Sequence, residues 1–176
     1  YRRQRQMCIR DSFLPSCAPE NVGYKALAVN LSDLAAAGAT PRAFFLSIGL
    51  PDRDDAWLAK FSQGMMALAR ETGCALLGGD TTRTAEVADK RAPVTISITA
   101  MGSLPAGKGI TRTGARPGDD IWVSGTPGDA YAGLKIAWGH WSAMDRPTAY
   151  FKSRMERPTA RVELGLSLIH ISEPTR

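Results

Sequence analysis

Two aspartates of this chain stand in sequence patterns that could hold a metal cation. The first, Asp33, lies on a helix that the apolar spacing predicts from about residue 24 to residue 37. At about 100° per residue, Asp33 points away from the leucine stripe and onto a face of small apolar residues. A carboxylate on such a face meets a close-packed neighbour at a desolvation cost, bonds a nearby backbone group, or faces a cation.

The second candidate, Asp80, follows a glycine pair, Gly78 and Gly79, and an apolar run that begins at Cys74. The run predicts a short buried strand that ends in the glycines, with Asp80 at the strand's end. Glycines let a backbone approach a phosphate closely, and a carboxylate at a strand's end can hold Mg²⁺. Turns use the same residue types, so the motif taken alone also fits a simple turn.

Three stretches together resemble the thiamine-monophosphate kinase family. They run from Gly23 to Pro41, from Leu77 to Arg83 and from Thr111 to Asp119, and the first carries Asn-Leu-Ser-Asp and the second Gly-Gly-Asp-Thr-Thr-Arg. The similarity extends from about residue 13 to residue 166 with one small insertion. The family sits in a superfamily of ATP-using enzymes that includes aminoimidazole ribonucleotide synthetase and selenophosphate synthetase.

The resemblance implies an activity and a set of site residues. The expected reaction is ATP-dependent phosphorylation of thiamine monophosphate to thiamine diphosphate, by direct in-line transfer assisted by Mg²⁺. Asp33 and Asp80 would bind Mg²⁺, Gly79 and Asp80 would lie against ATP, and Arg112 would reach the ATP phosphates. No covalent nucleophile is expected. The family also implies a homodimer formed by joining the sheets of two N-terminal domains.

The chain departs from the family pattern at several places. Ser12 stands where the family has a substrate-binding histidine, directly before the residue that matches Phe13. An upstream acidic metal motif and a downstream Asp-x-Ser-Asp-Gly motif are both absent. Because two aspartates are too few for the metal cluster, we expect the 176-residue chain to have little or no kinase activity by itself.

Other interpretations stay open. Another ATP-using enzyme of the superfamily is one, although Ser32 stands where aminoimidazole ribonucleotide synthetase has Asn, and Asp80 where it has Glu. Selenophosphate synthetase shares the Ser-Asp pair, but its nucleophilic Cys or Sec region would lie upstream. A non-catalytic binding or dimerisation module is the alternative from a different class, and ATP affinity that does not respond to Mg²⁺ would favour it.

Charge and hydropathy exclude several classes of partner. The formal charge is +5, but four arginines against one aspartate lie within residues 1–12, and no basic stripe with interleaved aromatics follows. Nucleic-acid binding is therefore not expected. No apolar run is long enough to span a membrane and no signal peptide is seen, so we expect a cytoplasmic protein. The three cysteines have neither metal-ligand spacing nor a disulfide framework.

Both ends of the chain look foreign to the rest. Residues 1–12 and 167–176 resemble translated sequencing adapters, and the family similarity stops near the same junctions. We therefore expect two artefactual tails around a natural fragment. Its parts are an ATP- and Mg²⁺-binding N-terminal domain over residues 13–115, incomplete at its start, and the truncated beginning of a C-terminal domain over residues 116–166.

The remaining elements follow from periodicity and turn residues. They are strands over residues 43–50, 94–101 and 118–125, helices over 54–72 and 128–138 with Asp129 as a helix N-cap, and a solvated loop over 84–91. With the first helix they predict an α/β (α+β) fold, a mixed sheet with helices on one face. The fold would resemble the N-terminal domain of the aminoimidazole ribonucleotide synthetase-like fold, followed by a truncated second α/β domain.

Overall fold

The computed structural model describes residues 2–8, 13–84, 92–142 and 146–171, without the side chains of residues 2–8, 170 and 171. It divides into two compact units. Unit 1 comprises Tyr1–Ile110 with Ala160–Arg176, and unit 2 comprises Thr111–Thr159. The first change of unit follows Ile110, whereas the expected boundary was after residue 115, and residues 160–166 belong to unit 1 and not to the expected second domain. The expected domain bounds therefore stay a prediction. Among the described helices, none has the length and apolar character needed to cross a membrane.

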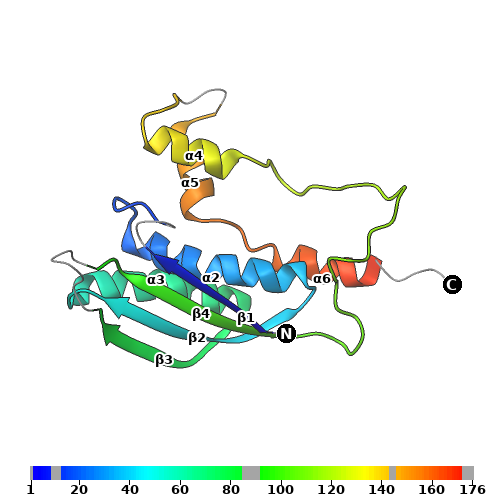
Figure 1. Cartoon of the computed structure of the whole chain (residues 1–176), viewed down its shortest axis with the longest axis horizontal. Coiled ribbons are helices and arrows are strands. Elements are labelled where there is room, and N and C mark those ends of the chain that lie inside the picture. The colour runs from blue at the N-terminus through cyan, green and yellow to red at the C-terminus, as the bar shows by residue number, and fades with distance from the viewer. Residues whose placement is uncertain (1, 9–12, 85–91, 143–145, 172–176) are drawn as a thin grey trace. The chain divides into compact units, whose positions relative to one another are not determined.

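A four-stranded mixed sheet forms the base of unit 1 (Figure 1). Its strands, in the order β1-β4-β2-β3, are β1 (Arg2–Cys8), β4 (Thr95–Ser103), β2 (Thr40–Leu50) and β3 (Ala75–Arg83). β1 and β2 each pair with β4 in antiparallel fashion, whereas β2 and β3 are parallel. Because α2 and α3 cover the same face, the predicted mixed sheet with helices on one face is confirmed.

The two long helices of unit 1 begin and end at residues suited to those places. α2 (Pro19–Ala36) has proline in its first turn and is followed by Gly38 at φ +71°. α3 (Asp55–Thr72) is capped by Asp54, whose carboxylate accepts a 2.9 Å hydrogen bond from the Trp57 N–H. The bounds of α3 match the expected helix over residues 54–72, whereas α2 begins five residues before the expected residue 24.

Glycines set how closely the helices approach one another. A Cβ on Gly23 of α2 would overlap the Phe61 carbonyl oxygen of α3, and one on Gly64 of α3 would overlap the Glu20 carbonyl oxygen of α2. α6 (Val162–Ile171) approaches α2 in the same way, at Gly165. Only glycine permits these backbone contacts, so the sequence fixes the helix layer at three crossing points.

The core lies between the sheet and its helices. The large side chains that are less than 2% exposed include Phe44, Ile48, Ile96 and Ile98 from the sheet, and Leu27, Leu31, Leu34, Phe61, Met65 and Leu68 from α2 and α3. β4 alternates between buried and half-buried positions, as expected for a strand with one covered face. Apolar burial on this scale is the main source of stability of unit 1.

The prediction for the strand that carries Asp80 was wrong in two respects. β3 is exposed along its whole length, not buried, and it continues through both glycines to Arg83, so Asp80 lies inside the strand and not at its end. β3 is the edge strand of the sheet, with β2 as its only neighbour in the described part of the chain. The apolar residues at its start were taken to indicate burial, but β3 lies at the edge of the described sheet and its side chains are exposed.

The two terminal segments contain regular structure. β1 pairs with β4 from Arg2 opposite Met101 to Cys8 opposite Thr95, and α6 continues through residues 167–171. Pairing shows where these residues lie and not where they come from, so their expected artefactual origin stays a prediction. The predicted loop over residues 84–91 falls, apart from Thr84, outside the described residues.

Unit 2 consists of an extended segment and a helix pair. α4 (Asp129–Ala137) packs against α5 (Thr148–Glu156), with Gly133 against the Phe151 carbonyl oxygen. The strand predicted within residues 118–125 is absent from the structure, because no other described strand of this unit offers the hydrogen bonds that a strand requires. Asp129 is not the N-cap of α4 as predicted, because Gly128 takes that place.

Candidate functional site

Asp33 lies in the last turns of α2. The neighbouring Leu31 and Leu34 are fully buried, whereas Asp33 itself is half-buried. The carboxylate therefore points away from the leucine stripe, as the helical periodicity predicted. The residue as a whole is therefore partly open to solvent.

Gly79 and Asp80 lie on the exposed edge strand β3, where Asp80 pairs with Ser47 of β2. A Cβ on Gly79 would overlap the Leu46 carbonyl oxygen of β2, so glycine is required here by sheet packing alone. This reason was not anticipated, because the sequence suggested only a close approach to phosphate. The exposed backbone and carboxylate of β3 can still accept a ligand along this edge.

The structure does not bring Asp33 and Asp80 together within one chain. Asp33 precedes the turn through Gly38 that leads into the first residue of β2, Thr40. Ser47, the partner of Asp80, lies about 23 Å farther along that strand at 3.3 Å per residue. The two carboxylates are therefore at different levels of unit 1 and on different elements.

The donor set meets only part of what a magnesium site needs. Mg²⁺ is commonly held by one or two carboxylates together with substrate phosphates and water, and the exposed Asp80 can supply one such ligand. Among the described residues there is no group of three or more His, Cys, Asp or Glu side chains that could hold a metal ion. Each aspartate by itself fits a cation that phosphate groups help to bind, and not a closed protein site.

A pocket of about 320 Å³ lies one residue beyond Asp80, where β2 and β3 end and α3 begins. Its lining residues are Leu50, Asp52, Arg53, Asp55, Leu58, Thr81, Thr82 and Arg83. Arg53 donates two 2.8 Å hydrogen bonds to Asp55, and these bonds lower the pKa of the Asp55 carboxyl. The carboxyl ends of parallel strands are a common place for ligands in open α/β sheets, a signal that sequence analysis missed because it needs the strand order.

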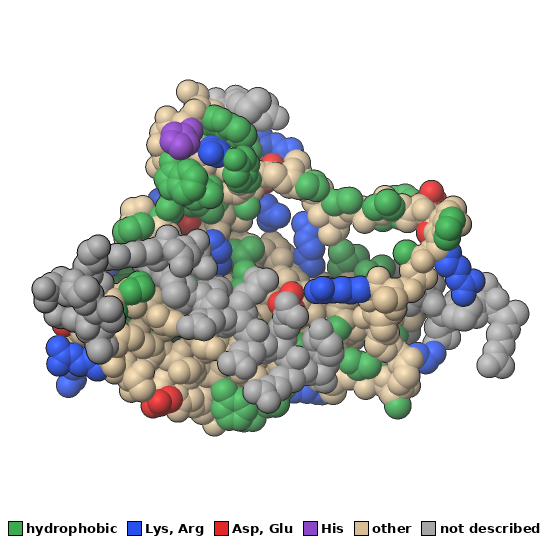
Figure 2. Space-filling model, viewed as in Figure 1, with side chains coloured by type: hydrophobic (Ala, Val, Ile, Leu, Met, Phe, Trp, Pro, Cys, Tyr) green, Lys and Arg blue, Asp and Glu red, His purple; other side chains and the backbone are tan. Residues whose placement is uncertain are grey.

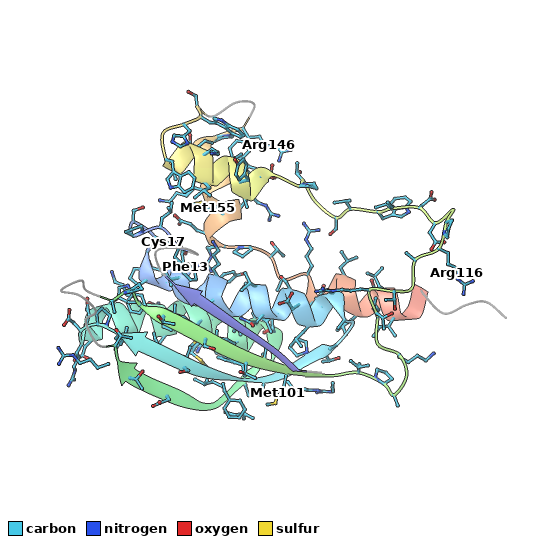
Figure 3. All side chains as sticks on the ribbon, viewed as in Figure 1. Phe13, Cys17, Met101, Arg116, Arg146 and Met155 are labelled. Carbon is cyan, nitrogen blue, oxygen red and sulfur yellow. The ribbon has the colours of Figure 1, made fainter. Side chains whose placement is uncertain are left out.

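The other predicted site residues lie elsewhere. Arg112 is exposed at the start of unit 2. Ser12 falls outside the described residues. Phe13, which follows it, is buried at the start of α2 close to Cys17 (Figure 3), with the Lys25 ammonium 5.3 Å from its ring centre. The free Cys74 thiol is buried, and burial raises its pKa to about 11, which argues against a nucleophilic role.

Comparison with known proteins places this geometry in a family. The family described as AIR synthase related protein, N-terminal domain, matches residues 6–104. Thiamine-monophosphate kinase of Escherichia coli (strain K12) is 44% identical over 157 residues, which are 89% of this chain and 46% of that protein. The relative from Salmonella typhimurium is 42% identical over 161 residues. The chain spans about half the length of the curated relatives it matches.

Solved structures agree in fold. Thiamine-monophosphate kinase from Stenotrophomonas maltophilia K279a superimposes with a TM-score of 0.86 at 37% identity, covering 97% of this chain and 53% of that one. A structure described as AaThiL complexed with AMPPCP and TMP gives a TM-score of 0.83 at 29% identity, covering 95% of this chain and 52% of that one. Since the family match covers more than half of its residues, the chain belongs to the AIR synthase related proteins.

Proposed function

We propose that this chain is part of a thiamine-monophosphate kinase of the cytoplasm, which uses ATP to form thiamine diphosphate. The observation that carries the proposal is the likeness, over nearly the whole chain, to a structure that binds AMPPCP and TMP. AMPPCP is an ATP analogue whose terminal phosphoryl group cannot be transferred by the usual route. Two phosphate-bearing ligands in one relative correspond to the donor and the acceptor that a phosphoryl transfer requires.

In the proposed reaction a terminal phosphate oxygen of thiamine monophosphate attacks the γ-phosphorus of ATP. A P–O bond forms there, the bond to the β,γ-bridging oxygen breaks, and ADP leaves with that electron pair. Because attacking and leaving oxygens stand in line, no covalent enzyme intermediate is needed. Mg²⁺, when bound, neutralises phosphate charge. This chain would contribute Asp33 and Asp80 as Mg²⁺ ligands, the β3 backbone at Gly79 to ATP, and the Arg112 guanidinium to the phosphates.

Asp80 offers the sharpest test of these roles. In the full-length enzyme, Asp80→Asn should lower turnover at least about 100-fold, because a metal ligand contributes several kcal/mol to stabilising the transition state. The matched control is Glu71→Gln, which changes an exposed carboxylate on the helix that precedes β3. ADP release in the presence of both substrates is the measurement. A near wild-type rate for Asp80→Asn would support a purely structural turn or strand role for this residue.

The 176-residue chain should bind nucleotide more readily than it turns it over. Titration calorimetry with AMPPCP, with and without Mg²⁺, measures binding, and thiamine diphosphate formation measures activity. We expect little or no product from the purified chain, since the described residues contain too few metal ligands. Vigorous product formation would contradict this. An AMPPCP affinity that is the same with and without Mg²⁺ would favour the interpretation as a non-catalytic binding module.

We further propose that the enzyme works as a homodimer joined through its sheets. Asp33 and Asp80 lie apart within one chain, and a second copy is a simple way to bring one of each together. Exposed apolar side chains on β2 and β3, namely Phe45 at 41% and Leu77 at 60%, offer surface for such a contact. Leu77→Lys should weaken the dimer in sedimentation equilibrium, whereas Leu164→Lys, at an exposed position of α6, should not. A chain that is monomeric at all concentrations would remove this part of the proposal.

A further inference from the structure

An aromatic surface on unit 2 has no part in the proposed phosphoryl transfer. Three large rings are exposed there, Tyr131 by 54%, Trp138 by 51% and Trp141 by 46%, and beside them lie the half-buried Lys135 and the exposed His140. We call these five residues the α4 patch. Figure 2 shows hydrophobic side chains and a histidine gathered on this part of the surface. Monomeric proteins rarely expose several large aromatic rings side by side unless the surface binds something.

The patch is assembled by the helix and the turn that follows it. Tyr131, Lys135 and Trp138 are spaced i, i+4 and i+7, so they form one stripe along α4. Gly139, at φ +71°, reverses the chain, and the His140 N–H then donates a 2.9 Å hydrogen bond to the Lys135 carbonyl. The turn brings the Trp141 ring edge-on to Tyr131, with 5.8 Å between ring centres.

The patch faces away from the partner helix of unit 2. The side of α4 that packs against α5 carries Asp129 and Gly133, both buried. Arg146 and Tyr150 join Asp129 on that side, through a 3.6 Å ion pair and a 2.6 Å hydrogen bond respectively. Stabilisation of the α4–α5 pair therefore does not use the aromatic stripe, and its rings remain available to a partner.

The charge of the patch is positive. The Lys135 ammonium lies 5.3 Å from the ring centre of Tyr131 and 5.4 Å from that of Trp138, which holds the cation at the middle of the surface. No acidic residue occurs in the sequence from residue 130 to residue 142. In the described part of the chain, no ion pair joins Lys135 to a carboxylate. A carboxylate brought by a partner would meet this cation without displacing one of the described acidic groups.

We propose that the α4 patch docks an acidic peptide segment, with carboxylates that reach Lys135 and an aromatic or aliphatic side chain that lies on the rings. Tryptophan and tyrosine are the residues that most often dominate protein interfaces, and charge complementarity then selects the partner. A second copy of this patch would place lysine opposite lysine. Nucleic acids and anionic lipid surfaces are bound through many cations, and this patch has one lysine.

The test is fluorescence anisotropy with two labelled peptides of the same length. One alternates glutamate with leucine and tryptophan, and the other has glutamine in place of every glutamate. We expect the acidic peptide to bind with a Kd below about 100 µM at low salt, at least about tenfold tighter than the neutral one. Lys135→Glu, and Trp138→Ala separately, should each weaken binding at least about tenfold. Lys60→Glu, an exposed lysine on α3 in the other unit, is the matched control.

Several results would overturn the proposal. They are no binding of the acidic peptide up to about 1 mM, equal binding of both peptides, or unchanged binding by Lys135→Glu. Tighter binding of single-stranded oligo-dT or of phosphatidylserine vesicles would assign the patch to another class of partner. Self-association of the chain that Trp138→Ala abolishes would assign it to a second copy. Far-UV circular dichroism of each variant separates these outcomes from misfolding, and Trp138→Phe should retain most of the binding if the ring is what matters.

Discussion

Units 1 and 2 use the same device to join helices but differ in what lies beside the helix pair. In unit 1, Gly23 and Gly64 bring α2 and α3 together, and in unit 2 Gly133 does the same for α4 and α5. The unit 1 pair covers a sheet, and its apolar side chains are buried. The residues that precede the unit 2 pair form no sheet, so Ile121 is 93% exposed and Trp122 is 89% exposed. Apolar residues in a strand-like pattern are buried only where partner strands exist.

The largest expected effect is the contrast between one aromatic residue of each unit. Phe44→Ala should cost about 3–5 kcal/mol of unfolding free energy, because Phe44 is fully buried between the sheet and its helices. Trp122→Ala should change the unfolding free energy by no more than about 0.5 kcal/mol. Urea unfolding followed by far-UV circular dichroism measures both. A cost above about 1 kcal/mol for Trp122→Ala would show that this segment packs against something, and the contrast between the units would fail.

The next effect concerns what holds unit 2 together without a sheet. The Tyr150 hydroxyl donates a 2.6 Å hydrogen bond to the carboxylate of Asp129, a residue that is only 8% exposed. Tyr150→Phe leaves that carboxylate with Arg146 at 3.6 Å, and should destabilise the helix pair by about 1.5–3 kcal/mol. Hydrogen exchange of the α4 and α5 amides is the measurement, since it reports this unit separately.

Tyr131→Phe is the matched control for that prediction. Tyr131 lies on α4 as well, but its ring is exposed, so loss of the hydroxyl should leave the exchange of these amides nearly unchanged. Equal effects of the two substitutions would mean that a polar network does not take the place of a core in unit 2. The stability of unit 2 would then have to be explained by something other than this polar network.

Much of unit 1 could be predicted because its signals are local. Gly73 ends α3 in the left-handed conformation and Asp54 caps its start, and both were visible in the sequence. The burial of β3 could not be predicted, since whether an apolar strand is central or at an edge depends on strand order. The prediction for residues 118–125 failed for the same reason. Periodicity suggested a strand, but whether a strand forms depends on a partner strand, which the local sequence does not encode.

The sequence named the residues of the candidate site, whose roles stay predictions, but it did not contain their geometry. Asp33 was placed correctly on the side of its helix that faces away from the leucines, because helical periodicity fixes direction. The separation of Asp33 from Asp80 depends on the pairing of Asp80 with Ser47, which no local pattern contains. The second reason for glycine at position 79, its contact with the Leu46 carbonyl, depends on the same register.

The smallest expected effect concerns the pH dependence of stability and the residue Cys74, which lies between the core and the exposed edge strand β3. Cys74 directly precedes β3 and is only 2% exposed, and burial raises the pKa of its thiol from an ordinary value of 9.0 to about 11. Below pH 9 both folded and unfolded chains keep the proton, so the contribution to stability is fully present. Between pH 9 and about 11 only the unfolded chain releases it, so stability falls as pH rises.

Cys74→Ala should therefore flatten the fall in unfolding free energy between pH 8 and about 11, although it removes the sulfur from the core. Urea midpoints at each pH give the slope, and the slope difference from wild type isolates this thiol from tyrosines and lysines that titrate in the same range. Cys17→Ala is the control, because Cys17 is half-buried and should leave the slope closer to that of wild type. If the Cys74→Ala slope equals the wild-type slope, the thiol ionises as readily in the folded chain as in the unfolded one. Cys74 would then resemble the exposed residues of β3 in its environment, and not the buried residues of the core.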